Sequence, residues 1–198
     1  MITKIRYGNT NTFYVSGEKG DILVDTDWAG TLPAFYRAIK DKVKVEQIKY
    51  LLITHYHPDH MGIAGELMEL GIQLLLLDVQ KEYVRYADPV FAKEKKRSYI
   101  PIHVDQATVI TCRESRAFLK GLGINGEIIH TPGHSDDSIS LVLDDGSAIV
   151  GDLYTWEAAM EYDNPQVMDS WKLLISKGVN RAFYGHANEQ VIEGGDLF

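Results

Sequence analysis

The feature that most constrains this chain is a short segment with four potential metal ligands. The segment His55–His60 reads His-Tyr-His-Pro-Asp-His and follows a run of apolar residues. His55 and His57 are two residues apart, so in an extended backbone their side chains project to the same side and can reach one metal ion. The proline then bends the chain, which allows Asp59 and His60 to face a second ion beside the first. This dense set of donors predicts a rigid site for two metal ions.

Three further potential ligands each follow a segment with the composition of a β-strand. They are His134, Asp152 and His186, and the strands predicted before them cover residues 127–130, 147–150 and 181–184. A single histidine in a loop is more often solvated than bound to a metal. Three donors at strand ends, in a chain with only 7 histidines, favour one site shared with the histidine-rich segment.

The hydrophobic pattern predicts groups of strands interleaved with helices. The predicted strands cover 2–7, 12–16, 21–25, 50–54, 72–77, 127–130, 138–143, 147–150 and 181–184. Helices are predicted over 32–42 and 61–70, from Asp88–Pro89, over 111–122 with a capping box at Thr111 and Glu114, and from Asn164–Pro165. This order predicts a layered α/β architecture with mixed sheets. A length of 198 residues is that of a single domain, residues 1–198.

Composition narrows the classes of partner. The formal net charge is −8, which disfavours nucleic acid because an acidic chain repels phosphate backbones. Apolar runs such as Leu74–Leu77 are far shorter than a membrane span, and the first residues lack the apolar core of a signal peptide. The lone cysteine, Cys112, excludes an internal disulfide framework. We therefore expect a cytoplasmic protein that acts on a small molecule, without membrane contact, as a monomer or homodimer.

Four motifs together resemble the metallo-β-lactamase superfamily. They are the segment His55–His60, Thr131–His134 (Thr-Pro-Gly-His), Gly151–Asp152 and Gly185–His186, and Asp25–Thr26 resembles an earlier block of the same family. The match covers nearly the whole chain. It implies a four-layer αββα sandwich, in which two mixed β-sheets are flanked by helices and metal ions lie in a cleft at one edge.

The resemblance also implies which side chains hold metal. The first ion would be bound by His55, His57 and His134, the second by Asp59, His60 and His186, and Asp152 would bridge the two. Five imidazoles and two carboxylates without a thiolate suit two divalent ions, Zn²⁺ first, with iron or manganese as alternatives. The two carboxylates and a bridging hydroxide leave such a centre positive, so it can polarise a carbonyl or phosphoryl oxygen.

Some residues near the predicted ligands have more than one interpretation. Asp59 and Asp152 are candidates to receive or relay a proton. Tyr154 is a candidate to donate a hydrogen bond to a developing oxyanion, or else is a wall residue. Asp25 either orients a ligand or caps a strand end.

Other polar features outside the predicted ligand set also have open roles. Asp136 and Asp137 follow His134 and either disfavour anionic substrates or face water. His130 is expected to make a local hydrogen bond at a strand end. The basic run Lys93–Arg97 either binds an acidic group or is a solvated helix face. The tyrosine-containing region 78–102 either covers the substrate or forms a packed helical satellite.

The predicted activity is hydrolysis of a small-molecule ester, thioester or lactone at a dinuclear centre. Three alternatives remain: phosphodiester hydrolysis on a small nucleotide or RNA, oxidation by an iron-dependent enzyme similar to persulfide dioxygenases, and, least favoured, metal-stabilised binding without turnover. A true β-lactamase is disfavoured, because those enzymes lack a bridging aspartate at the place of Asp152.

Overall fold

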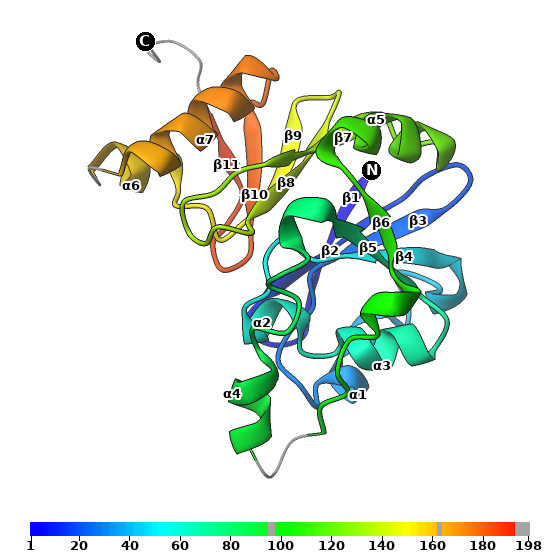
Figure 1. Cartoon of the computed structure of the whole chain (residues 1–198). Helices are drawn as coiled ribbons and strands as arrows, with labels where there is room; N and C mark the ends of the chain where they lie inside the picture. Colours follow the sequence, from blue (N-terminus) through cyan, green and yellow to red (C-terminus); the bar gives the residue numbers. More distant parts are fainter. Residues whose placement is uncertain (95–97, 162–163, 193–198) are drawn as a thin grey trace.

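The computed structural model of the chain describes residues 1–94, 98–161 and 164–192. In this part of the chain the strands form two mixed sheets (Figure 1). The first sheet has the order β1 (Ile2–Arg6), β2 (Asn11–Val15), β3 (Asp21–Val24), β4 (Ile48–Leu52), β5 (Gln73–Leu77) and β6 (Thr108–Ile110). The second has the order β11 (Gln190–Val191), β10 (Arg181–Tyr184), β9 (Ser147–Gly151), β8 (Ile139–Leu143) and β7 (Gly126–His130).

Each sheet combines antiparallel and parallel pairs. In the first sheet β1, β2 and β3 are antiparallel neighbours, and β3, β4, β5 and β6 run parallel. In the second sheet β7, β8 and β9 are antiparallel, β9 and β10 are parallel, and β11 is antiparallel to β10. The prediction of mixed sheets is therefore confirmed.

Helices cover the outer faces of both sheets. The α-helices are α1 (Leu32–Ile39), α2 (Pro58–Met61), α3 (Ala64–Glu69), α4 (Asp88–Lys93), α5 (Cys112–Gly121), α6 (Trp156–Glu161) and α7 (Pro165–Ser176). Short 3-10 helices are η1 (Val45–Gln47), η2 (Asp78–Gln80) and η3 (Val104–Gln106). Figure 1 shows α1 and α3 beside the first sheet and α6 and α7 beside the second.

The alternation of side chains along the strands produces the layers. In β5, Leu74 and Leu76 belong to the core under α1 and α3, whereas Leu75 and Leu77 belong to the core between the sheets. Both faces of this strand are buried, so its four leucines are all fully buried. A third core lies under α6 and α7 and contains the buried Trp171. These three apolar layers make up the predicted αββα sandwich.

One predicted helix is interrupted. The segment 61–70 contains the last residue of α2 and the whole of α3, and the two helices are separated at Gly62 and Ile63. The carbonyl of His60 accepts hydrogen bonds from the backbone N–H of Thr26 and from its hydroxyl, at 2.9 and 3.1 Å. That carbonyl is therefore used outside the helix, where a continuous helix would pair it with residue 64.

Other element boundaries differ from the sequence predictions by a few residues. The first helix ends at Ile39, and Asp88 is the first residue of α4, which follows Ala87 as its N-cap. The capping box of Thr111 and Glu114 and the Asn164 cap of α7 are confirmed. Strands β6 and β11 and helix α6 were not predicted, because they are short and lack a distinct pattern. No described helix is long and apolar enough to cross a membrane.

Candidate metal centre

The histidine-rich segment links β4 to α2. His55 is fully buried, His57 is the extended N-cap residue of α2, and Pro58 occupies the first turn, where its missing N–H is not needed. Nε2 of His55 lies 3.1 Å from Nδ1 of His57, which lies 3.0 Å from Nε2 of His134. Three ring nitrogens from two segments therefore converge on one point, and they belong to the residues that the family resemblance assigns to the first ion.

The second predicted group converges beside the first. Nε2 of His186 lies 3.1 Å from a carboxylate oxygen of Asp59 and 3.3 Å from Nε2 of His60. His60 is fully buried, whereas His186 is exposed at the end of β10. The groups His55–His57–His134 and Asp59–His60–His186 each have ligand atoms close enough to share one cation.

Asp152 lies between the two groups at the end of β9. Its Oδ2 is 3.7 Å from Nε2 of His134 and 3.4 Å from Nε2 of His186, and its Oδ1 is 3.3 Å from Nε2 of His60. Oδ1 is buried but accepts no hydrogen bond within the described residues. A buried carboxylate oxygen without a donor is costly. A cation at this position would remove that cost, so the residues present fit metal binding.

Hydrogen bonds on the outer side of the rings fix which nitrogen carries the proton. The Thr54 hydroxyl donates to Asp25 at 2.7 Å, so it accepts from Nδ1 of His55 at 3.2 Å. The carboxylate of Asp25 also lies 2.9 Å from Nδ1 of His60. Each contact places a proton on Nδ1 and leaves Nε2 free to bind a metal ion.

The same arrangement is found at His186. Its Nδ1 lies 3.2 Å from the carbonyl oxygen of Asn9, which can only accept a hydrogen bond. The Nε2 atom therefore keeps its lone pair toward Asp59. Asp25 contacts His60 directly and reaches His55 through Thr54, which fits the interpretation that it orients ligands. Its φ of 59° is the only positive value of a described residue other than glycine.

The electrostatics of the site favour positive charge. Burial and the neighbouring histidines lower the pKa of His55 well below its usual value, so this ring is neutral. Burial also lowers the pKa of His60, but the carboxylates of Asp25 and Asp152 outweigh it and raise that pKa to about 10. These carboxylates attract a cation to Nε2 of His60, and a metal ion bound there would replace the proton.

Two small cavities border the donor groups. We call the first, of about 250 Å³, the carboxylate cavity; its lining includes His57, Tyr83, Tyr86, His134, Asp136 and Asp137. The second, of about 320 Å³, is the apolar cavity, whose lining includes His134, Asp152, Leu153, Tyr154, Ala158 and Tyr184. Because His134 belongs to both, the donor groups lie between the two cavities. Tyr154 therefore lies near the predicted ligands.

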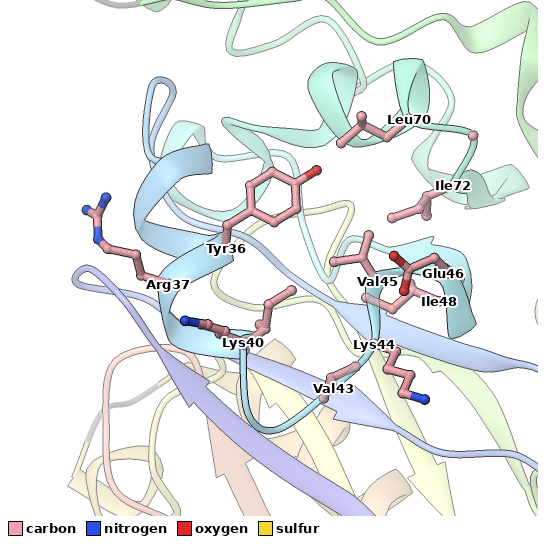
Figure 2. Close-up of a pocket in the computed structure, with 12 residues that line it drawn as sticks. Tyr36, Arg37, Lys40, Val43, Lys44, Val45, Glu46, Ile48, Leu70 and Ile72 are labelled. Carbon is pink, nitrogen blue, oxygen red and sulfur yellow. The ribbon is translucent and has the colours of Figure 1, made fainter.

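A larger cavity of about 770 Å³ lies between α1, η1 and the end of α3. Figure 2 shows Tyr36 directed across it toward Leu70, with Lys40 and Lys44 pointing away from the apolar side chains. None of the predicted ligands lines this cavity. Its size alone therefore does not make it the reactive site.

Several residues that support the site were not predicted. The side-chain amide of the buried Gln80 donates to the carbonyls of Ile53, Thr54 and Asp137. The side chain of Asn11 donates to the backbone beside His186. A single glutamine or asparagine carries no pattern in a sequence, so nothing in the sequence indicates these contacts.

The remaining sequence predictions have mixed outcomes. His130 makes the expected local contact, with Nε2 2.7 Å from the carbonyl oxygen of Asp136. Region 78–102 contains the short helix α4, whose Phe91 packs against Trp28. In the basic run Lys93–Arg97, residues 95–97 lie outside the described residues.

Comparison with known families identifies the fold. A model of the metallo-beta-lactamase superfamily matches residues 5–186. The chain belongs to this superfamily. The resemblance noted in the sequence motifs is thereby confirmed, and so is the predicted sandwich, because similar solved structures share it.

Relatives in the superfamily carry several names. A beta-lactamase-like protein 2 homolog of Drosophila melanogaster is 26% identical over 90% of this chain and 59% of its own length. A probable metallo-hydrolase of Methanocaldococcus jannaschii is 26% identical over 94% of this chain and 92% of its own. An atrochrysone carboxyl ACP thioesterase of Claviceps purpurea is 24% identical over 80% and 48%. The chain spans 59% and 48% of the first two curated relatives it matches.

Solved structures show the same fold. A metallo-beta-lactamase family protein of Thermus thermophilus superposes with a TM-score of 0.70 at 20% identity, over 96% of this chain and 74% of that one. A protein solved in a di-iron-bound form gives a TM-score of 0.67 at 21% identity, over 96% and 94%. Two of the relatives are named for hydrolysis, the probable metallo-hydrolase and the thioesterase.

Proposed function

We propose that this chain uses a dinuclear metal centre to hydrolyse a small-molecule ester, thioester or lactone. One observation carries the proposal: two groups of ligand atoms lie side by side, and the carboxylate of Asp152 reaches both. A pair of divalent ions bound there supplies Lewis acidity and a water with a pKa of about 7. Zn²⁺ is the first candidate, with iron or manganese as alternatives.

The chain's own residues would perform the remaining tasks. The outer hydrogen bonds of His55, His60 and His186 orient these rings before any ligand binds. The carboxylates of Asp59 and Asp152 lie among the ligand atoms and would accept or relay a proton there. We assign Tyr154 the donation of a hydrogen bond to the developing oxyanion, because it borders the apolar cavity together with Asp152.

The thioester class has support beyond geometry. One relative that aligns with 80% of this chain is named a thioesterase. A phosphodiester would use the same centre, but the net charge of −8 repels such substrates. The di-iron-bound neighbour shows that this fold can hold iron, so metal analysis is the first experiment.

The test begins with metal quantification on protein purified without added metal. The wild-type chain should hold two ions and hydrolyse at least one member of a panel of thioesters, lactones and phosphodiesters. His57→Ala and Asp152→Ala should fold, as judged by circular dichroism, but lose metal and activity. Asp145→Asn, at the opposite end of β9, serves as the control and should retain both.

Four results would contradict the proposal. Full activity with one ion per chain would exclude the dinuclear mechanism. Turnover of phosphodiesters only would favour the alternative hydrolase, and a single iron with oxygen consumption on a persulfide would favour the oxidoreductase. A fully metallated protein without any turnover would favour a binding module.

A further inference from the structure

The two cavities beside the donor groups differ in chemistry. In the apolar cavity, Leu153, Ala158, Tyr154 and Tyr184 provide mostly hydrocarbon surface. In the carboxylate cavity, Asp136 is exposed and Asp137 is buried. A substrate lying across the centre would therefore have one end in each environment.

Two carboxylates, those of Asp136 and Asp137, line the carboxylate cavity. Asp137 uses one carboxylate oxygen to accept the backbone N–H of Tyr56 at 2.7 Å, which holds the acid in place. Desolvation and the carboxylates of Asp136, Asp137 and Glu82 together raise the pKa of the Tyr83 hydroxyl. No lysine or arginine belongs to the described lining of this cavity.

Aromatic rings complete this cavity. Tyr86 is 63% exposed, and its ring centre lies 6.1 Å from that of His57. Tyr83 lines the same space. The exposed Tyr86 and the half-buried Tyr83 lie beside carboxylates, and such a surface attracts an ammonium group through the ring faces and through charge. Anionic groups would be repelled here.

We propose that the substrate has an apolar end and a positively charged end on opposite sides of the bond that is hydrolysed. The ammonium group lies in the carboxylate cavity and the apolar group in the apolar cavity. This inference rests on the proposed function and specifies its substrate class. For a thioester, the oxygen of water bonds to the acyl carbon and the acyl–sulfur bond breaks, which releases a carboxylate, a thiol and one proton.

A matched series of thioesters tests the proposal on the metal-loaded full chain. Butyrylthiocholine carries a cationic thiol, S-butyryl-2-mercaptoethanol a neutral one and S-butyryl-3-mercaptopropionate an anionic one. A second series of thioesters keeps butanethiol as the leaving group and carries the cationic, neutral or anionic group on the acyl part instead. In one of the two series, kcat/KM should fall from cation to neutral to anion, and added salt should reduce the difference.

Asp136→Asn removes one cavity charge without changing the size of the side chain. One exposed carboxylate attracts a cation roughly two- to fivefold and repels an anion to the same extent, so the cation-to-anion ratio should fall roughly 4- to 25-fold. Asp145→Asn is the control, since it removes an exposed carboxylate at the far end of β9. Its ratio should equal that of the wild type.

Binding is measured separately from turnover. Calorimetry with the thioether S-butylthiocholine, which cannot be hydrolysed, should show binding that weakens in Asp136→Asn and persists in Asp145→Asn. Charge-selective binding without turnover would support this inference and contradict the proposed hydrolase. Turnover with equal or greater preference for the anionic thioesters in both series would overturn the inference and leave the hydrolase intact.

Discussion

Asp25 shows how one residue can organise a site that it does not itself form. Its carboxylate accepts the backbone N–H and the hydroxyl of Thr54, both at 2.7 Å, and lies 2.9 Å from Nδ1 of His60. It is fully buried and adopts a φ of 59°, which aspartate and asparagine tolerate better than most residues. The orientations of the His55 and His60 rings thus both depend on Asp25, for His55 through Thr54.

Asp25→Asn should keep the backbone geometry but place an amide where the carboxylate faced His60. We expect metal affinity to fall about 10- to 100-fold, the usual effect of losing a partner behind a ligand. Competition with a chromogenic chelator measures this affinity. Asp27→Asn, two positions further along the chain, is the matched control, and unchanged affinity in Asp25→Asn would show that the acid is only a strand cap.

At Gly151 the backbone conformation and the neighbouring Thr54 side chain leave no room for a larger residue. Its φ is +58°, and a Cβ atom placed on it would lie 2.5 Å from the Thr54 hydroxyl oxygen. Gly151→Ala should therefore lower the free energy of unfolding by about 1–3 kcal/mol, because strain and overpacking add. Urea denaturation tests this. Gly178→Ala, where φ is +82° and no atom lies near, separates the backbone strain from the clash.

At the scale of elements, the turn between β1 and β2 holds the second group of donors. The Thr10 hydroxyl donates to the carbonyl of Asp59 at 2.8 Å. The side chain of Asn11 donates to the carbonyls of Tyr184 and Ala187, at 2.8 and 2.9 Å, on both sides of His186. The start of β2 in the first sheet thereby holds the end of β10 in the second sheet, where His186 lies.

Asn11→Ala removes both donated hydrogen bonds and leaves buried carbonyls without donors. We expect a loss of about 1–3 kcal/mol in the free energy of unfolding, measured by urea denaturation, and weaker binding of the second ion than of the first. Asn9→Ala is the control, because Asn9 contacts His186 through its backbone carbonyl alone. Equal effects of the two substitutions would contradict the assignment.

For the molecule as a whole, we expect metal binding to stabilise the two sheets together. The donors come from the first sheet, through the segment after β4, and from the second, through the ends of β7, β9 and β10. An ion that binds only the folded chain shifts unfolding by mass action, by about 2.7 kcal/mol at a hundredfold excess over the dissociation constant. Chelation should therefore lower Tm, as measured by calorimetry, and should do so much less in Asp152→Ala.

The sequence by itself determined the features that depend on near neighbours. The period of the apolar residues predicted the strands other than β6 and β11. The capping residues Thr111 and Asn164 predicted two helix starts, and the strand-end motifs contained the donors that converge. Each of these signals lies within a few residues, where backbone geometry relates sequence spacing directly to direction in space.

Only the tertiary structure decided the contacts between distant segments. Asn11 and Tyr184 are 173 positions apart, and Gln80 reaches two separate segments, residues 53–54 and Asp137. The break between α2 and α3 depends on Thr26 from another loop. The charge of one cavity and the apolar lining of the other arise where the sheets meet. Such contacts depend on how the layers pack, and packing depends on the sum of many weak interactions that no local pattern records.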